Sequence, residues 1–246
     1  MKTKAAFSLI YEDENIAVVN KISGIAVIVD RWDPCRERLD KLVAEVLKIQ
    51  KIYTVHRIDR ETSGLVVFAK NSETHKALST AFENRQVKKR YIAVVHGRPS
   101  WSETVCDLPL IPNGNKLHLT IIDKYRGKES LTAFRLLGSA GNYSVVEALP
   151  ETGRTHQIRV HLASLNHPVV CDDFYGNDKP VFLSAIKRGW RGDPQEERPL
   201  LSRLGLHAAE ITFQKPAVQT FKAPLPRDMA ALINQMEKAS GKEFNL

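Results

Sequence analysis

The sequence has few cysteines, few aromatic residues and no long apolar run. Cys35, Cys106 and Cys171 stand apart without the paired spacing of a zinc site, and their odd number argues against a disulfide framework. This scarcity favours a reducing compartment, and we expect a cytoplasmic protein. No eighteen consecutive residues are apolar, and no apolar segment follows Lys2 and Lys4, so the sequence predicts neither a membrane span nor a secretion signal.

Internal repeats, low-complexity tracts and an evident interdomain linker are also missing, which excludes a repeat architecture. Of the 246 residues, 43% are hydrophobic and 26% are charged, a balance typical of globular proteins. A chain of this length can bury a substantial core. We therefore expect one globular domain over residues 1–246, and a monomer by default.

Basic residues outnumber acidic ones. The 36 Lys and Arg residues against 28 Asp and Glu give a formal net charge of +8, and the sequence pI is about 9.4. A positive protein attracts polyanions because each neutralised phosphate releases a condensed counterion. Composition alone leaves two alternatives open, an acidic partner such as nucleic acid or a surface charge that serves solubility.

Apolar spacing and turn residues predict more short strands than helices, without the regular alternation of a parallel βαβ sheet. We therefore predict a mixed α+β fold. The predicted strands are 7–11, 16–20, 64–70, 91–96, 131–137, 143–149 and 204–213. The predicted helices are 38–50, a segment around 77–82 capped by Asn71 or Ser72, 155–165 and 229–238. Residues 176–203, rich in Gly, Pro and charge, predict a long surface excursion.

The densest polar cluster is His56-Arg57-Ile58-Asp59-Arg60-Glu61-Thr62-Ser63-Gly64, directly before a predicted buried strand. A loop anchored by a rigid strand can hold a carboxylate in fixed geometry, as an active site requires. The alternative is a charged turn in which Asp59 and Thr62 only satisfy backbone donors. The cluster alone does not decide between the two.

A second cluster, residues 151–162, reads ETGRTHQIRVHL and places guanidinium and imidazole groups at the start of a predicted helix. Arginine can pair bidentately with a carboxylate or a phosphate. The alternative here is a solvated helix face.

Together the two clusters resemble the pseudouridine synthases of the RluA type, which act on ribosomal RNA and tRNA. HRIDRETSGLVVFAK at 56–70 is similar to the family signature around its catalytic aspartate, and GRTHQIRVHLASLNHPVVCDDFYG at 153–176 is similar to its second signature. Three shorter stretches agree, at 11–25, 88–97 and 203–213. The resemblance covers residues 7–226, and its long motifs are far more specific than a lone Gly-rich pattern.

The resemblance implies a mainly antiparallel sheet core in two subdomains, flanked by helices, with a central RNA-binding cleft. It also implies that a uridine in RNA is isomerised to its C-glycoside, without a metal or an organic cofactor. It makes Asp59 the catalytic nucleophile, Arg159 its cationic partner and Tyr91 the ring that stacks on the uracil. Burial opposes a charged carboxylate unless a cation compensates it, which is the part expected of Arg159. Whether the attack falls on C6 of uracil or C1′ of ribose, or a glycal forms instead, stays open.

The same resemblance places further residues near the uridine or its RNA. Arg154 is expected to meet phosphate, and His56 and Arg57 to grip a flipped-out nucleotide or fill the gap that it leaves. Leu206 is expected in the pocket wall. The full set of RNA- or uridine-binding residues expected is His56, Arg57, Arg60, Thr62, Arg154, His156, Gln157 and Leu206.

The sequence departs from the family pattern at two points. Ile22 stands where proline is usual, and Cys171 precedes Asp172 where glycine is usual. No small basic RNA-binding module is recognised ahead of the catalytic motifs, so we expect substrate selection to come from the catalytic domain or from partners.

Two rival functions remain. His156, His161 and His167 near Asp172 and Asp173 could indicate a metal-dependent hydrolase, although two histidines five residues apart on a helix diverge by about 140°. The other rival is an RNA-binding protein that kept the fold and lost the catalysis. The presence of Asp59, Tyr91 and Arg159 argues against this rival.

Overall fold

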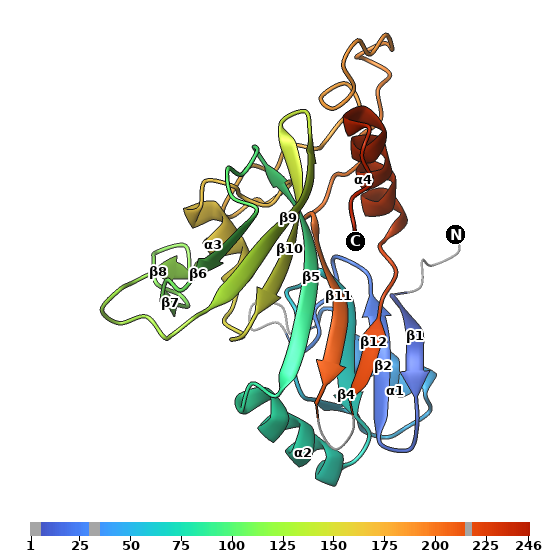
Figure 1. Ribbon diagram of the computed structural model, residues 1–246. Helices are drawn as coiled ribbons and strands as arrows, with labels where there is room; N and C mark the ends of the chain where they lie inside the picture. The colour runs from blue at the N-terminus through green and yellow to red at the C-terminus, as the bar shows by residue number, and fades with distance from the viewer. Residues whose placement is uncertain (1–5, 30–34, 215–217) are drawn as a thin grey trace. The chain divides into compact units, whose positions relative to one another are not determined.

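The computed structural model describes residues 6–29, 35–214 and 218–246 (Figure 1). The chain forms two compact units. Unit 1 comprises Met1–Lys89 and Ala208–Pro224, and unit 2 comprises Arg90–His207 and Leu225–Leu246. The chain leaves unit 1 within strand β5 (Val87–His96) and returns to it within strand β11 (Leu206–Phe213).

Unit 1 is built on a sheet in the order β1-β2-β4-β11. The predicted hairpin is confirmed: β1 (Phe7–Glu12) pairs antiparallel with β2 (Ile16–Lys21). β2 in turn pairs antiparallel with β4 (Ser63–Ala69), so that Lys21 lies opposite Gly64. The short strands β3 (Tyr53–Thr54) and β12 (Gln219–Lys222) pair with β4 and β11. This register brings the end of β2 beside the start of β4, where the first polar cluster lies.

The core of unit 1 forms around β4, in which every residue is buried. Its continuous apolar run allows both faces of the strand to be covered, and Leu65 and Val67 pack with Val18 and Phe213. The predicted helices are present as α1 (Leu39–Val46) and α2 (Ser72–Glu83). Asn71 caps α2 by accepting the backbone N–H of Thr74 at 2.8 Å.

Unit 2 contains an antiparallel sheet in the order β5-β10-β9-β6. Its centre is the predicted hairpin of β9 (Thr132–Ala140) and β10 (Tyr143–Pro150), and β6 (Glu103–Cys106) forms the far edge. The small hairpin of β7 (Leu110–Ile111) and β8 (Ile121–Ile122) stands apart from this sheet.

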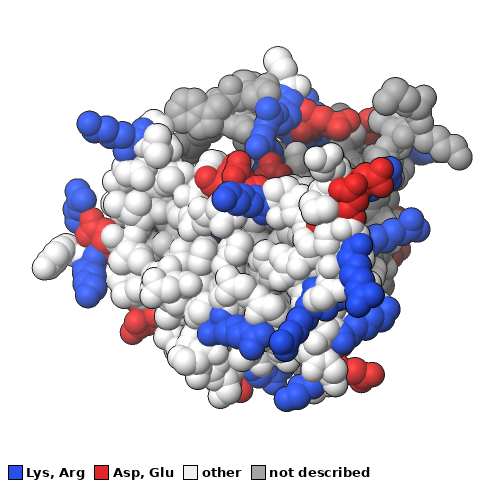
Figure 2. Space-filling model, turned by 90° about the horizontal axis from the view of Figure 1, so that it is seen from above, with Lys and Arg blue, Asp and Glu red and all other residues white. Residues whose placement is uncertain are grey.

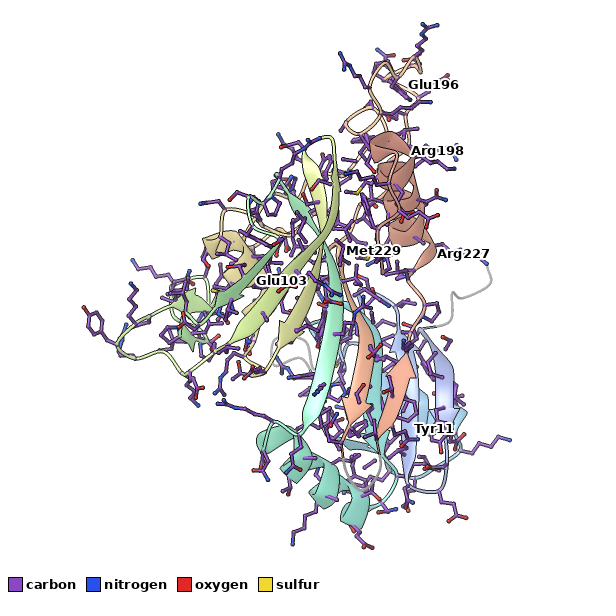
Figure 3. All side chains as sticks on the ribbon, in the orientation of Figure 1. Tyr11, Glu103, Glu196, Arg198, Arg227 and Met229 are labelled. Carbon is purple, nitrogen blue, oxygen red and sulfur yellow. The ribbon has the colours of Figure 1, made fainter. Side chains whose placement is uncertain are left out.

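Two helices complete unit 2. α3 (Gln157–Ser164) buries Ile158 and Leu162 against Phe134 and Val146, as their spacing predicts. The helix starts later than predicted, because His156 has φ +55° and stands outside it as the N-cap. α4 (Arg227–Ser240) packs on β9 and buries a face that includes Met229, which Figure 3 labels near the start of the helix.

Residues 176–203 are largely irregular, as the sequence predicts. A single bridge between Val181 and Leu201 closes the base of this segment. Behind it, Arg203 pairs bidentately with Asp228 of α4, with both N–O distances at 2.7 Å. Glu196 and Arg198 lie near its outer end (Figure 3). The segment is therefore anchored at its base while much of its length is exposed.

The predicted mixed α+β fold with a mainly antiparallel sheet is confirmed. No helix in the described part of the chain is long and apolar enough to cross a membrane. Residues 1–5, which carry both lysines of the N-terminal segment judged against a secretion signal, lie outside the described ranges. The extent of the catalytic domain over 1–246 stays a prediction.

Candidate catalytic loop and arginine centre

The loop that carries Asp59 lies in unit 1 between β3 and β4. Asp59 is half-buried, and its carbonyl accepts the backbone N–H of Thr62 at 3.1 Å, which closes a turn within the loop. Ile58, next to it, is buried and fixes the loop to the core. The aspartate therefore follows a buried anchor and precedes a rigid strand, as the sequence predicts for a positioned carboxylate.

Residues 21–24 clamp this loop from the side. Lys21 is only 1% exposed, and its ammonium donates to the carbonyls of Arg60 at 2.8 Å and Ile22 at 2.9 Å. The backbone N–H of Gly24 donates to the same Arg60 carbonyl at 2.9 Å, and the Ser23 hydroxyl donates to the Glu61 carbonyl at 2.7 Å. These bonds hold the backbone just after Asp59, which limits the movement of its carboxylate.

Gly64 fixes the far end of the loop. Its φ is +114°, which L side chains rarely adopt, and a Cβ there would lie 2.3 Å from the backbone oxygen of Ala208 in β11. Only glycine therefore lets β4 begin at this close approach, which explains the last residue of the HRIDRETSG motif.

His56 is a structural member of the loop. Its Nε2 accepts the backbone N–H of Val67 at 3.0 Å, and its ring stacks on Phe82 at a centroid distance of 4.7 Å. Burial, with a contribution from the positive charge of Lys89, lowers the pKa of His56 to about 3. The imidazole is therefore neutral near pH 7, with its proton on Nδ1. A neutral His56 offers a phosphate no positive charge.

The other predicted residues of the loop differ in environment. Arg57 is exposed, and Arg60 forms a surface pair with Glu61 at 2.7 Å. Thr62 is 2% exposed, and its hydroxyl is buried without a hydrogen-bond partner among the described residues. A buried orphan hydroxyl is uncommon in proteins, so Thr62 is a group that a substrate could satisfy.

Unit 2 contains a buried arginine centre around α3. Arg159 is 2% exposed and Asp172 is fully buried. The guanidinium donates through Nε to Asp172 Oδ2 at 2.8 Å and through Nη2 to Oδ1 at 2.6 Å. Burial alone would raise the pKa of Asp172, but Arg159 and the backbone N–H groups of Phe174 and Tyr175 bring it below its ordinary value.

Two aromatic rings and a histidine surround this ion pair. The guanidinium carbon of Arg159 lies 5.1 Å from the ring centroid of Phe174 and 5.2 Å from that of Tyr175. The Tyr175 hydroxyl accepts the backbone N–H of Thr120 at 3.0 Å and lies 2.9 Å from Nδ1 of His156. Arg159 is therefore held by a bidentate carboxylate, and its guanidinium carbon lies over the faces of two mutually perpendicular rings.

Gln157 and Arg154 are held by the protein itself. The Gln157 amide oxygen accepts from the Thr152 hydroxyl at 2.7 Å and the Arg154 N–H at 2.9 Å, and its nitrogen donates to Leu131 and Thr132. All four positions of the amide are thus used, and the side chain is 4% exposed. These bonds fix the start of α3, and the contact of Gln157 with uridine stays a prediction. Arg154 is half-buried and donates to the Glu129 carbonyl at 3.0 Å.

Tyr91 and Leu206 belong to the same unit as Arg159. Tyr91 lies on β5 opposite Ala148 of β10, and its half-buried ring packs against the main core of unit 2. Leu206 is 3% exposed and is part of that core. Both positions are compatible with a wall beside a bound base.

The histidines of the rival metal site make separate hydrogen bonds. His161 lies 3.0 Å from both the Thr132 hydroxyl and the Leu108 carbonyl, and His167 contacts the His96 carbonyl at 2.9 Å. Within the described ranges, no group of three or more His, Cys, Asp or Glu residues has the arrangement of a metal site. The structure gives the hydrolase alternative no support.

Sequence reasoning missed Asp172, Tyr175 and Lys21 as parts of these arrangements. The run Cys171-Asp172-Asp173-Phe174-Tyr175 held the signal, since an acid followed by two aromatic residues is a natural partner for a buried arginine. Lys21 gave no signal, because a lysine at the end of a strand is normally exposed.

The structure brings the predicted residues together in two groups. His56, Arg57, Asp59, Arg60 and Thr62 share the loop of unit 1. Tyr91, Arg154, His156, Gln157, Arg159 and Leu206 lie in unit 2. Because Asp59 and Arg159 belong to different units, the ion pair between them stays a prediction.

A family model described as RNA pseudouridylate synthase matches residues 15–164. The dual-specificity RNA pseudouridine synthase RluA of Escherichia coli (strain K12) is 35% identical over 227 residues, which are 88% of this chain and 92% of that protein. The ribosomal large subunit pseudouridine synthase D of Zymomonas mobilis is 32% identical over 93% of this chain and 72% of its own length. Its namesake from Neisseria meningitidis serogroup B is 32% identical, and this chain spans only 64% of that relative.

Among solved structures, human RNA pseudouridylate synthase domain containing 1 is similar with a TM-score of 0.70 at 27% identity, over 92% of this chain and 87% of that one. The chain thus belongs to the RNA pseudouridylate synthase family, in its RluA type, whose members isomerise uridine to pseudouridine in RNA.

Proposed function

We propose that this protein isomerises a specific uridine of ribosomal RNA or tRNA to pseudouridine, with Asp59 as the nucleophile. The observation that carries the proposal is the clamped HRIDRETSG loop, which holds the backbone beside a half-buried carboxylate and lies inside the region that the family model matches. A carboxylate held in this way can attack the nucleotide without first ordering its own loop.

Arg159 is proposed as the cation that keeps Asp59 ionised. Its bidentate pair with Asp172 fixes the direction of a buried guanidinium, and a fixed positive charge lowers the cost of keeping a nearby carboxylate ionised. Asp172, which fixes the orientation of Arg159, is a positioning residue in this scheme.

Tyr91 is proposed to stack on the uracil after the glycosidic bond is broken, and Leu206 to line the wall beside it. Stacking on an aromatic ring contributes roughly 1 to 3 kcal/mol per base, which helps to retain a detached uracil until it is rejoined through C5. The uridine must leave its stack to reach Asp59, at a cost of a few kcal/mol. Arg57, Arg60 and Arg154 are proposed phosphate contacts, and Thr62 and His156 are proposed to lie near the nucleotide.

The names of the relatives support ribosomal RNA as a candidate substrate, and they allow more than one RNA target. One relative is named for the large ribosomal subunit and another for dual specificity. Mapping pseudouridine in RNA from cells with and without the gene identifies the site, because the absence of one pseudouridine names the substrate.

The catalytic role of Asp59 is tested with Asp59→Ala and Asp59→Asn. RNA isolated from cells that lack the gene and carry uridine tritiated at C5 is the substrate, because rejoining through C5 releases that tritium. We expect tritium release to fall on the order of 10⁴-fold or more in both variants, while RNA binding is largely kept.

Asp40→Asn, an acid-to-amide change on α1, is the matched control and should keep wild-type activity. Wild-type activity in Asp59→Ala would refute the nucleophile assignment. RNA binding by the wild-type protein without any pseudouridine formation would favour the rival binding protein.

A further inference from the structure

The segment 176–203 forms a pocket that the proposed catalytic step does not use. The pocket has a volume of about 430 Å³ and is lined by residues 184–190 together with Gly141 of the β9–β10 turn. We call it the 184–190 pocket. It is a shallow depression that is open to solvent, and an extended strand can lie against such a surface.

The wall of this pocket is ordered by its own contacts. Ile186 is 5% exposed and anchors the wall to unit 2. Ser184 donates its backbone N–H and its hydroxyl to the two carboxylate oxygens of Glu197, at 2.8 and 2.6 Å. The backbone N–H groups of Ile186 and Lys187 both donate to the Leu183 carbonyl. The segment is therefore a preformed surface and not a free chain.

The chemistry of the pocket is cationic and aromatic. Lys187 and Arg188 are exposed, and neither side chain has an ion-pair partner within the described residues. Arg98, also exposed, donates to the Gly141 carbonyl at 2.8 Å at the edge of the pocket. Positive charge is thus available at the lining and beside Gly141.

Trp190 supplies a flat apolar wall. It is half-buried, and a Cβ added at Gly192 would lie 2.2 Å from its ring. The indole is therefore held against Gly192 while it also lines the pocket. A fixed ring beside exposed cations is the combination that binds single-stranded nucleic acid, with stacking for the base and charge for the phosphate.

Acidic residues of the segment have hydrogen-bond partners of their own, and the Glu197 carboxylate keeps its negative charge beside Ser184 of the lining. Glu197 is engaged by Ser184, and the Asp193 carboxylate accepts the backbone N–H of Gln195 at 2.8 Å. Glu196 lies near the outer end of the segment (Figure 3). Figure 2 shows that Lys and Arg form separate groups on this face, some with Asp and Glu between them. The positive charge is therefore not spread evenly over the surface.

We propose that the 184–190 pocket binds single-stranded RNA at a nucleotide other than the reacting uridine, with Lys187 and Arg188 on phosphates and Trp190 stacked on a base. The inference rests on the proposed function, because it assumes an RNA substrate. It assigns the segment a role in choosing the substrate, separate from the chemistry at Asp59.

The test measures binding of a fluorescein-labelled 20-nucleotide oligouridine by the full chain, at several salt concentrations. We expect Lys187→Glu/Arg188→Glu to weaken binding at least tenfold at 100 mM salt. If two phosphate contacts are lost, the slope of log Kd against log salt should fall by about 1.4, at about 0.7 per phosphate of a single strand. Lys41→Glu/Lys76→Glu, with the same change in charge on exposed helix positions, is the control and should bind about as tightly as wild type.

Trp190 is tested separately. Trp190→Ala should weaken binding roughly fivefold or more and should leave the salt slope unchanged, because stacking does not release counterions. Gly192→Ala, which displaces the ring without removing it, should have an intermediate effect. Addition of the oligouridine to wild type should quench tryptophan fluorescence, and Trp190→Phe should lose that quenching. Circular dichroism must show all variants folded.

Binding affinity and salt slope equal to wild type in Lys187→Glu/Arg188→Glu would overturn the inference, as would equal weakening in the control pair. Failure of the wild type to bind the oligouridine would also overturn it. The proposed function fails on a different result, the absence of pseudouridine formation by wild type, so the two failures are distinguishable.

Discussion

His56 provides a test of how the loop around Asp59 is built. In the folded protein its pKa is about 3, because burial and the charge of Lys89 oppose a second positive charge. In the unfolded chain its pKa returns to about 6.5. Between these values the unfolded state binds one more proton than the folded state, so the free energy of unfolding must decrease as the pH falls from 6.5 toward 3.

The size of the effect follows from the two pKa values. Each pH unit in this window changes the free energy of unfolding by about 1.4 kcal/mol. At pH 5, about 1.5 units below the unfolded pKa, His56 should therefore lower the stability by roughly 2 kcal/mol relative to pH 7.5.

The perturbation is His56→Gln. The glutamine carbonyl can accept the Val67 N–H that Nε2 accepts at 3.0 Å, but it does not titrate. We expect the variant to be less stable than wild type at pH 7.5, because the stacking on Phe82 is lost, and to recover roughly 2 kcal/mol of that difference at pH 5. Urea unfolding at both pH values measures it, and carboxylates that titrate in both proteins cancel in the comparison.

Lys89→Met separates the two causes. Removal of the Lys89 charge should raise the pKa of His56, yet leave it below 6.5, because burial is the larger cause. The His56 ring signals in NMR spectra recorded between pH 3 and 8 report this directly. A wild-type His56 that titrates near 6.5, or a stability difference that does not change between pH 5 and 7.5, would refute the picture of a half-buried, neutral imidazole.

Three further substitutions each test one local feature inside a single unit: a close backbone approach, a strained residue and a buried ion pair. Gly64→Ala should cost more than about 3 kcal/mol or prevent folding, as measured by soluble yield and urea unfolding, because a Cβ would clash with the backbone of Ala208. Cys171 has φ +56°, so Cys171→Gly should be about 1 kcal/mol more stable in urea than Cys171→Ala, which loses the same thiol but keeps the strain; equal stabilities would contradict this. Asp172→Asn should cost about 3 kcal/mol at pH 7, because it leaves the Arg159 charge buried and poorly paired. Because the pKa of Asp172 is lowered, the penalty should shrink as the pH falls below about 4, and a penalty independent of pH would speak against it.

The sequence predicted the elements whose signals are local. The hairpin of β1 and β2, the buried strand β4 and the cap of α2 at Asn71 all follow from turn residues, apolar runs and capping chemistry. The short strands β3, β7 and β8 were missed, because two-residue pairings depend on the partner strand and carry no periodicity of their own.

In the candidate site, too, local signals were predicted from the sequence and tertiary contacts were not. Motifs alone identified the Asp59 loop and the arginine of α3, but they did not predict how these groups are held. The start of α3 was placed too early, because nothing local signals the left-handed conformation of His156. The motif assigned Gln157 to uridine binding but did not predict its four hydrogen bonds inside the protein. Two of them reach Thr152 and Arg154, five and three residues away, and two reach Leu131 and Thr132, 26 and 25 residues away.

Buried cations organise the predicted catalytic groups in both units, but they are satisfied by different means. Lys21 donates to backbone carbonyls, so it fixes a loop and brings its positive charge to the residue after Asp59. Arg159 donates to the carboxylate of Asp172, which fixes the direction of the guanidinium and offsets much of its charge. The lysine ammonium, whose N–H donors can rotate, suits the binding of several carbonyls, and the planar guanidinium suits bidentate pairing with a carboxylate. Lys21→Arg and Arg159→Lys would therefore each disturb the local geometry, although both substitutions preserve the net charge.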